Sequence, residues 1–169
     1  IGGDTTISTV WGINRTSVDS GRDPSTGSRH DLQIEWAFGG ANEFWKLDHD
    51  SSWYFSLDEE KKWVFSVRAR QGIGSAMGSS EHIPLANRYF AGGSTTIRGY
   101  DARDVGPKEK EILNLFGEDV AIGGELRLLN SLELKYKANK WFRTYLFLDS
   151  GGVWREPGDF GFGDMQYSI

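Results

Sequence analysis

The chain has 169 residues, a formal net charge of −5, 22 glycines, 14% aromatic residues and no cysteine. It therefore has no disulfide framework and no cysteine-ligated metal, and its weak acidity argues against a general nucleic-acid-binding surface. No run approaches the ~18 apolar residues of a membrane-spanning helix. Many glycines and aromatics with few continuous apolar runs favour short-turned β-structure.

Six segments alternate apolar and polar residues with the period of two that is typical of strands. The predicted strands lie near residues 5–14, 28–38, 43–57, 63–74, 121–137 and 141–154. In the second segment, for example, the even positions from His30 to Phe38 oppose the polar odd positions from Arg29 to Glu35. At roughly 10 to 17 residues, these strands are long against a usual mode of about 5–6.

The connections between these strands differ in length. Short turns are predicted at Asp23–Gly27, Asp58–Lys62 and Ala138–Lys140, and a brief link at Gly39–Asn42. One long connection spans 75–120. Short turns on one side and variable loops on the other are typical of an outer-membrane β-barrel, and Trp and Tyr near several strand ends suit interfacial girdles. Alternation alone leaves open a soluble antiparallel sandwich or a lipocalin-like barrel.

The long connection carries an ordered set of glycine, aromatic and basic residues. It contains Phe90-Ala91-Gly92-Gly93, then Ile97-Arg98-Gly99-Tyr100, then Gly106-Pro107. Paired glycines permit a tight backbone course, and an arginine beside a Gly-aromatic pair is well placed to meet a carboxylate on a neighbouring surface. This set resembles the sixth extracellular loop of the BamA-type outer-membrane assembly proteins, the bacterial surface-antigen family, whose hallmark is (V/I)-R-G-(F/Y).

Four further motifs of this family have counterparts in the expected order. They are Asp23-Pro24 to Gly27-Ser28-Arg29, Phe44-Trp45-Lys46, Ser131-Leu132-Glu133-Leu134, and Phe147-Leu148-Asp149-Ser150-Gly151-Gly152-Val153-Trp154. The resemblance spans nearly the whole chain. It implies an all-β fold of antiparallel transmembrane strands, with about six of the family's sixteen strands in one domain segment over 1–169. Ile1 is not an initiator methionine, and we expect the segment to be part of a longer chain.

The resemblance also implies a structural clamp on the long connection. In the family this loop folds back into the lumen, and its arginine pairs with acids on the wall, which corresponds here to Arg98 with Glu133 and Asp149. Parity independently favours a lumenal Glu133, opposite the leucine-rich face, whereas the strand of Asp149 is mixed. The implied role is stabilising the loop and not chemistry. The loop motif comprises Gly92, Gly93, Ile97, Gly99, Tyr100, Gly106 and Pro107.

The family's barrel folds and inserts other β-barrel proteins into the bacterial outer membrane. The resemblance thus implies, as partners, outer-membrane lipid, unfolded β-barrel substrates, and periplasmic accessory lipoproteins and chaperones reached through upstream POTRA domains. It implies no cofactor and no nucleic acid. A two-partner-secretion transporter or a TamA-like factor of the same superfamily remains an alternative, and a soluble β-sandwich binding module is a second one.

Signals of an enzyme are weak. His30, His49 and His82 are scattered, without the paired spacing of a metal site. Asp48 and Asp50 share a strand face and could mimic paired catalytic acids, but a charged strand face explains them better. The sequence therefore predicts a non-enzymatic protein without a metal site.

Overall fold

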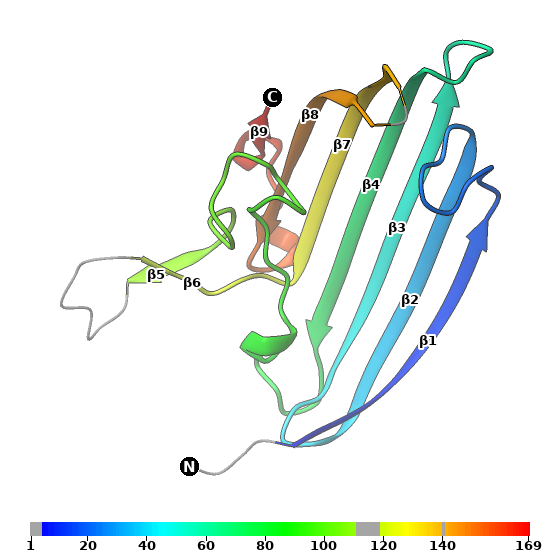
Figure 1. The fold of residues 1–169 in the computed structure, drawn as a ribbon. Helices are drawn as coiled ribbons and strands as arrows, with labels where there is room; N and C mark the ends of the chain where they lie inside the picture. Colours follow the sequence, from blue (N-terminus) through cyan, green and yellow to red (C-terminus); the bar gives the residue numbers. More distant parts are fainter. Residues whose placement is uncertain (1–4, 111–118, 140) are drawn as a thin grey trace.

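The computed structural model describes residues 5–110, 119–139 and 141–169. Seven strands form one antiparallel sheet in the order β1-β2-β3-β4-β7-β8-β9, and β5 and β6 pair separately (Figure 1). The strands are β1 (Thr6–Thr16), β2 (Gly27–Gly40), β3 (Phe44–Ser56), β4 (Trp63–Ala76), β5 (Lys108–Lys110), β6 (Asp119–Ala121), β7 (Leu126–Lys137), β8 (Arg143–Trp154) and β9 (Gln166–Ser168). The predicted all-β antiparallel fold is confirmed.

Two strand boundaries differ from the alternation pattern. The fifth long strand begins at Leu126 and not near residue 121, because Ala121 pairs in β6 and Gly123 adopts a φ of 63° that interrupts extended backbone. The sixth begins at Arg143 and not at 141. The Asn139 side-chain oxygen accepts hydrogen bonds from the backbone N–H groups of residues 141 and 142, at 2.8 and 2.9 Å, and holds both in the turn.

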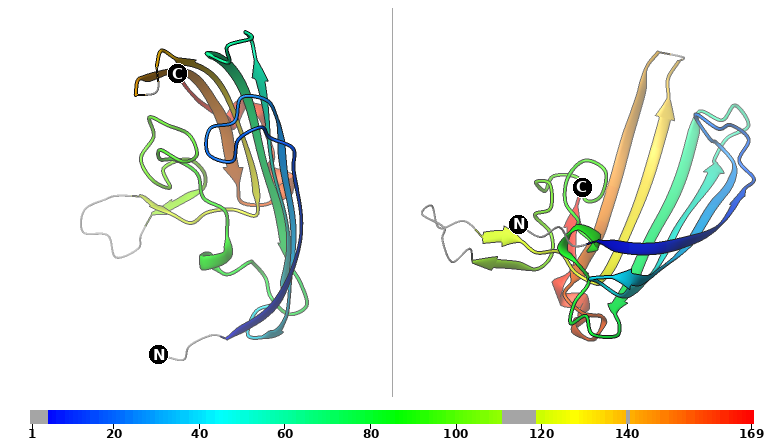
Figure 2. Two further views of the ribbon diagram at one scale, coloured as in Figure 1. Left: turned by 45° about the vertical axis from the view of Figure 1, so that its right-hand side comes forward. Right: turned by 90° about the horizontal axis from the view of Figure 1, so that it is seen from below.

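The sheet is curved, and the long connection between β4 and β7 lies on its concave side (Figure 2). This connection, predicted as one long loop over 75–120, is partly regular. It contains the 3-10 turn η1 (Leu85–Asn87) and the β5–β6 pair, while the part at 111–118 lies outside the described residues. Two more 3-10 turns, η2 (Pro157–Asp159) and η3 (Phe162–Asp164), precede β9, which is too short to have produced a recognisable alternation.

The two faces of the sheet differ in chemistry. Large apolar side chains stay exposed on the convex face, including Ile13 at 72% and Leu146 at 72%. The concave face carries charged side chains such as Arg127 and Glu133, which meet the long connection or other side chains of the wall. An apolar outer band with a polar inner face is typical of a transmembrane barrel wall. Within the described residues, no helix is long and apolar enough to cross a membrane.

The core lies between the long connection and the concave face, not within the sheet. Its main cluster comprises Tyr89, Ala91, Ile97, Val105, Leu129 and Val153. Four of these six residues come from the connection and two from β7 and β8. The connection is therefore packed onto the wall as part of the fold.

Candidate functional site

The centre of the candidate site is the Arg98 side chain, which extends from the long connection to β7 and β8. Its Nε and Nη2 donate to the two carboxylate oxygens of Asp149, each at 2.7 Å, and its Nη1 donates to Glu133 Oε1 at 2.7 Å. Nη2 also donates to Ser131 Oγ at 3.1 Å, and the backbone N–H of Arg98 donates to Asp149 at 3.1 Å. The guanidinium thus makes a bidentate contact with one acid and a single contact with a second.

The wall side of this contact is built from two directly opposed residue pairs of β7 and β8. Ser131 pairs with Asp149, and Glu133 pairs with Phe147. The Ser131 hydroxyl donates to Asp149 at 2.7 Å, and the Arg98 guanidinium carbon lies 3.7 Å from the centre of the Phe147 ring. One arginine therefore contacts all four residues. We call Arg98 with Ser131, Glu133, Phe147 and Asp149 the Arg98 cluster.

Burial differs within the Arg98 cluster. The Asp149 side chain is 1% exposed, whereas those of Arg98 and Glu133 are 28% and 29% exposed. A cavity of about 280 Å³ adjoins the cluster between the connection and the inner faces of β3, β4, β7 and β8. A charge buried like that of Asp149 is stable only when it is paired and hydrogen-bonded. The two acids are therefore unequal, and Asp149 depends most on Arg98.

Glycines set the course of the connection around Arg98. Gly92 has a φ of 104°, and a side chain there would place Cβ 2.2 Å from the Asp101 carbonyl oxygen. Gly106, with a φ of 124°, lies so close to β8 that a Cβ would meet Val153 at 2.9 Å. Both positions require glycine for conformation and for space. The remaining motif residues lie on the same path: Gly93 and Gly99 also have positive φ, Ile97 is fully buried, and Pro107 accepts a backbone hydrogen bond from Ile122.

Tyr100 lies at the end of the Arg98 motif and contacts the last part of the chain. Its side chain packs against the main core cluster, and its hydroxyl donates to Gln166 Oε1 at 3.0 Å. Tyr100 thereby ties the connection to β9 as well as to the wall. Nothing in the sequence predicts this contact, because β9 has only three residues.

Two glycines of β4 form a flat docking surface that sequence reasoning did not assign. A Cβ on Gly72 would lie 2.6 Å from the Tyr89 ring, and one on Gly74 would lie 2.8 Å from Ile83. The Tyr89 hydroxyl donates to Asp48 at 3.0 Å across this surface. The Gly-x-Gly spacing therefore lets the connection pack closely against β4, and Asp48 accepts the hydrogen bond from Tyr89 of the connection.

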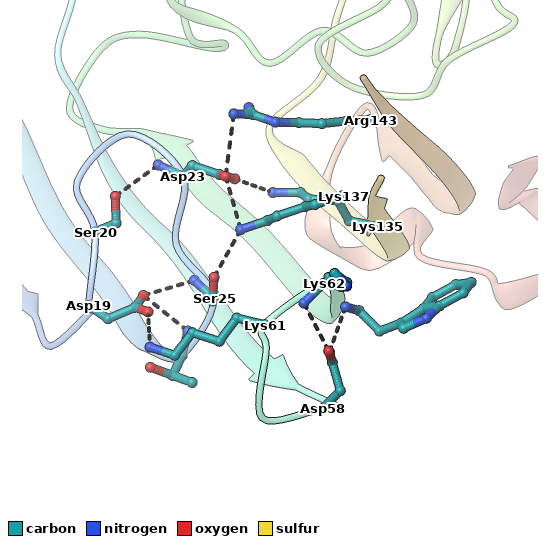
Figure 3. A network of polar contacts seen from close by, with 12 residues as sticks. Asp19, Ser20, Asp23, Ser25, Asp58, Lys61, Lys62, Lys135, Lys137 and Arg143 are labelled. Carbon is teal, nitrogen blue, oxygen red and sulfur yellow. Dashed lines mark hydrogen bonds and ion pairs between the residues drawn. The ribbon is translucent and has the colours of Figure 1, made fainter. Parts of the chain in front are cut away.

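A second polar cluster lies beside the Arg98 cluster on the same two strands, toward the β7–β8 turn, where the turn 17–26 bends over the concave face (Figure 3). Asp23 forms ion pairs with Lys135 and Lys137, both at 2.9 Å, and with Arg143 at 3.6 Å. Burial opposes ionisation of Asp23, but the hydrogen bonds from the two lysines outweigh it and hold its pKa below the ordinary value. We call these four residues the Asp23 cluster.

The turn 17–26 is also tied to the neighbouring β3–β4 turn. Lys61 donates to Asp19 at 2.8 Å, and the backbone N–H groups of Ser25 and Thr26 donate to the same carboxylate (Figure 3). The hydrogen bond from Lys61, reinforced by these two, lowers the pKa of Asp19. The turns at this end of the sheet thus form one connected polar network.

The two aspartates that could mimic catalytic acids, Asp48 and Asp50, both interact with other side chains. Asp48 binds Tyr89 and also accepts from Arg127 at 3.2 Å, and Asp50 pairs with Arg68. Within the part of the chain that the structure describes, no three His, Asp or Glu side chains gather as metal ligands. The histidines are less scattered than their spacing suggested, because the strand register brings His30 and His49 onto one patch of the convex face.

This arrangement defines a class of protein. A curved antiparallel sheet with an apolar convex face, a charged concave face and a connection packed inside is the wall of an outer-membrane β-barrel. The model of the Omp85 superfamily domain matches residues 2–166, and the chain belongs to that superfamily. The fold and the family place the segment in a bacterial outer membrane.

Individual relatives support the same assignment. The chain is 29% identical over 150 residues to the outer membrane protein assembly factor BamA of Neisseria meningitidis, an alignment that covers 85% of this chain and 18% of that protein. It is 32% identical over 93 residues to a SAM50-like protein of Schizosaccharomyces pombe, covering 52% of this chain and 18% of the relative. The crystal structure of Haemophilus ducreyi BamA lacking POTRA domains 1–3 superposes with a TM-score of 0.77 at 26% identity, over 88% of this chain and 30% of that one.

Proposed function

We propose that this segment is the back wall and lumenal loop of a protein that folds and inserts β-barrel proteins into the outer membrane. Membership of the Omp85 superfamily and similarity to a relative named as an assembly factor support this function. The chain spans 18% of that relative's length, so the activity belongs to a longer protein of which this wall is one part.

The single observation that carries the role of this segment is the Arg98 cluster. Five hydrogen bonds from one residue fix the connection against β7 and β8. Because the bidentate contact is directional, it sets the position of the loop on the wall in addition to attracting the loop to the wall. We infer that the cluster is a structural clamp, which keeps the lumenal loop in one place while substrate folds elsewhere on the barrel.

The proposed partners follow from this function. They are outer-membrane lipid around the convex face, unfolded β-barrel proteins as substrates, and periplasmic lipoproteins and chaperones that act through other domains of the longer protein. The insertion step needs no covalent chemistry. An incoming strand requires only backbone N–H and C=O groups with which to pair.

The test uses the full-length parent protein reconstituted in phospholipid vesicles. A urea-unfolded β-barrel protein is added, and its folding is followed by the change in gel mobility on heating. We expect the parent to accelerate folding several-fold over empty vesicles, Arg98→Glu to lose most of that gain, and Arg98→Glu with Asp149→Arg to recover part of it. Arg68→Gln is the matched control, since it removes an inner-face arginine whose ion pair is exposed.

The outcomes separate the clamp from the function. Additive effects of the Arg98 and Asp149 substitutions would remove the clamp and leave the insertase. A parent that fails to accelerate folding but releases a dedicated polypeptide across the vesicle membrane would instead be a secretion transporter.

A further inference from the structure

One row of residues across the convex face is polar except for one alanine. The pairing register places Arg15, His30, Ser51, Ala69, Asn130 and Ser150 side by side across the six long strands. All six positions share the parity of exposed apolar residues such as Ile13, Leu146 and Leu148, and so face outward. Among the outward-facing positions of these strands, Arg15 is the only one with a charged side chain.

The two histidines near Arg15 are satisfied by their neighbours. His30 shares hydrogen bonds with Ser28 at 3.0 Å and with Ser51 at 2.8 Å, and His49 shares hydrogen bonds with Ser51 at 2.6 Å and with Gln71 at 2.8 Å. Both nitrogens of each ring are therefore occupied. Arg15 differs, because its exposed guanidinium forms no hydrogen bond or ion pair with the described part of the chain.

The position of Arg15 corresponds to the edge of the membrane. It is the last residue but one of β1, beside the turn 17–26. His30 is the cross-strand partner of Arg15, and the ring of Trp53 packs edge-on against His30, with 5.3 Å between ring centres. Tryptophan is enriched where hydrocarbon meets the headgroups, and long basic side chains near strand ends reach the same level. These features put the guanidinium of Arg15 at the level expected for lipid phosphates.

An apolar groove of about 580 Å³ begins at Arg15 and His30. It continues over Ile13, Leu32 and Leu47 toward the middle of the sheet. One end of the groove therefore has an unpaired cation, and the rest of its lining is mostly hydrocarbon. This is the pattern of an amphiphile with an anionic head and an apolar tail.

We propose that Arg15, flanked by His30, binds the phosphate of an anionic phospholipid whose acyl chain lies in this groove. The planar guanidinium matches the geometry of a phosphate, with two parallel donors. A second copy of the chain is a poorer occupant. The outward-facing positions of the strands hold no carboxylate, so a two-fold contact through this face would leave both Arg15 side chains without an anion. The site goes beyond the proposed insertion activity and does not depend on it.

The test uses the folded full-length parent, released from phosphatidylglycerol nanodiscs and weighed by native mass spectrometry. We expect wild type to retain one lipid that Arg15→Gln loses, a drop of roughly tenfold in occupancy for a lost charge-assisted contact. Leu32→Trp, which fills the groove with another apolar side chain, should lower occupancy as well. Arg15→Lys should be intermediate, and Arg22→Gln, in an exposed turn arginine, should match wild type.

Several results would overturn the proposal. These are equal retention of phosphatidylcholine, loss of lipid by Arg22→Gln, unchanged occupancy in Leu32→Trp, or displacement of the lipid by inorganic phosphate alone. A dimer that Arg15→Gln dissociates would assign the face to a second copy. Each variant is first checked for the heat-dependent gel mobility of the folded barrel. Arg15→Lys keeps the comparison valid if Arg15→Gln does not fold.

Discussion

The two polar clusters anchor two different connections to the same pair of strands, with opposite charge. In the Arg98 cluster the connection supplies the cation, and β7 and β8 supply two acids. In the Asp23 cluster the turn supplies the acid, and the same strands supply three cations. Each connection therefore matches in charge only its own part of the wall. Exchanging them would bring like charges together.

The two clusters also differ in how well the wall residues tolerate the loss of their partner on the connection. Asp149 is buried and has Arg98 as its only cationic partner among the described residues, whereas the cations around Asp23 are long side chains near a strand end. Lysine and arginine can extend to water when their partner is removed, but a buried aspartate cannot. This contrast predicts unequal costs.

The largest effect is expected from Arg98→Ala in the full-length barrel. Because it leaves Asp149 buried without its cation, we expect the free energy of unfolding to fall by about 3–5 kcal/mol. Urea unfolding followed by tryptophan fluorescence measures this. Arg98→Ala combined with Asp149→Asn should recover part of the loss, and a double variant no better than the single one would contradict the account.

A smaller effect is expected from Asp23→Asn. The substitution removes the charge that Lys135 and Lys137 share, and we expect a cost of about 1.5–3 kcal/mol, as for hydrogen bonds to charged groups. Limited proteolysis should cleave the turn 17–26 faster in this variant. Asp31→Asn, in β2, is the control, and equal cleavage rates in the two variants would show that the Asp23 cluster does not hold the turn.

Arg68→Gln should have a smaller effect again. The side chains of Arg68 and Asp50 are 47% and 38% exposed, and exposed pairs contribute about 0–1 kcal/mol. The same urea titration should give a curve close to wild type. A loss as large as that of Arg98→Ala would mean that burial does not rank the inner-face ion pairs.

The smallest effect is expected from lowering the pH from 7 to 5. The pKa of Asp23 and that of Asp19 are both lowered in the folded protein, so their contribution to stability is present above the unfolded value near 3.8 and is lost only as pH falls through the folded value. Between pH 7 and pH 5, rates of proteolysis in the turn 17–26, measured with an acid-tolerant protease, should therefore not change. A rise within that window would show that the two carboxylates are not held ionised.

Much of the fold is visible in the sequence because alternation is a local property. The long strands, the turn between β3 and β4 and the parity of Glu133 all follow from residues that are close together. The connection predicted as a short turn at Asp23–Gly27 instead runs from 17 to 26. The short β9 and the β5–β6 pair carry too few residues to alternate visibly. Their pairing depends on the shape of the whole connection.

The contacts of the site are less visible because they depend on register. Nothing near Ser131 in the sequence shows that it lies opposite Asp149, or that Phe147 lies under the arginine. His30 and His49 appeared unrelated until pairing placed Ser51 between them. The family resemblance identifies Arg98, Glu133 and Asp149 as candidates. The neighbours that orient them, Ser131 and Phe147, are visible only in the structure.

The four wall residues of the Arg98 cluster have a consequence for assembly of the barrel itself. They form two successive inward-facing pairs of the β7–β8 hairpin, separated by the outward-facing pair of Leu132 and Leu148, and all four follow Arg98 in the chain. A slip of one residue between the strands would turn one strand's contribution away from the lumen. The full set of Arg98 contacts therefore requires the native register of the β7–β8 hairpin, because only that register brings the four wall residues together on the inner face.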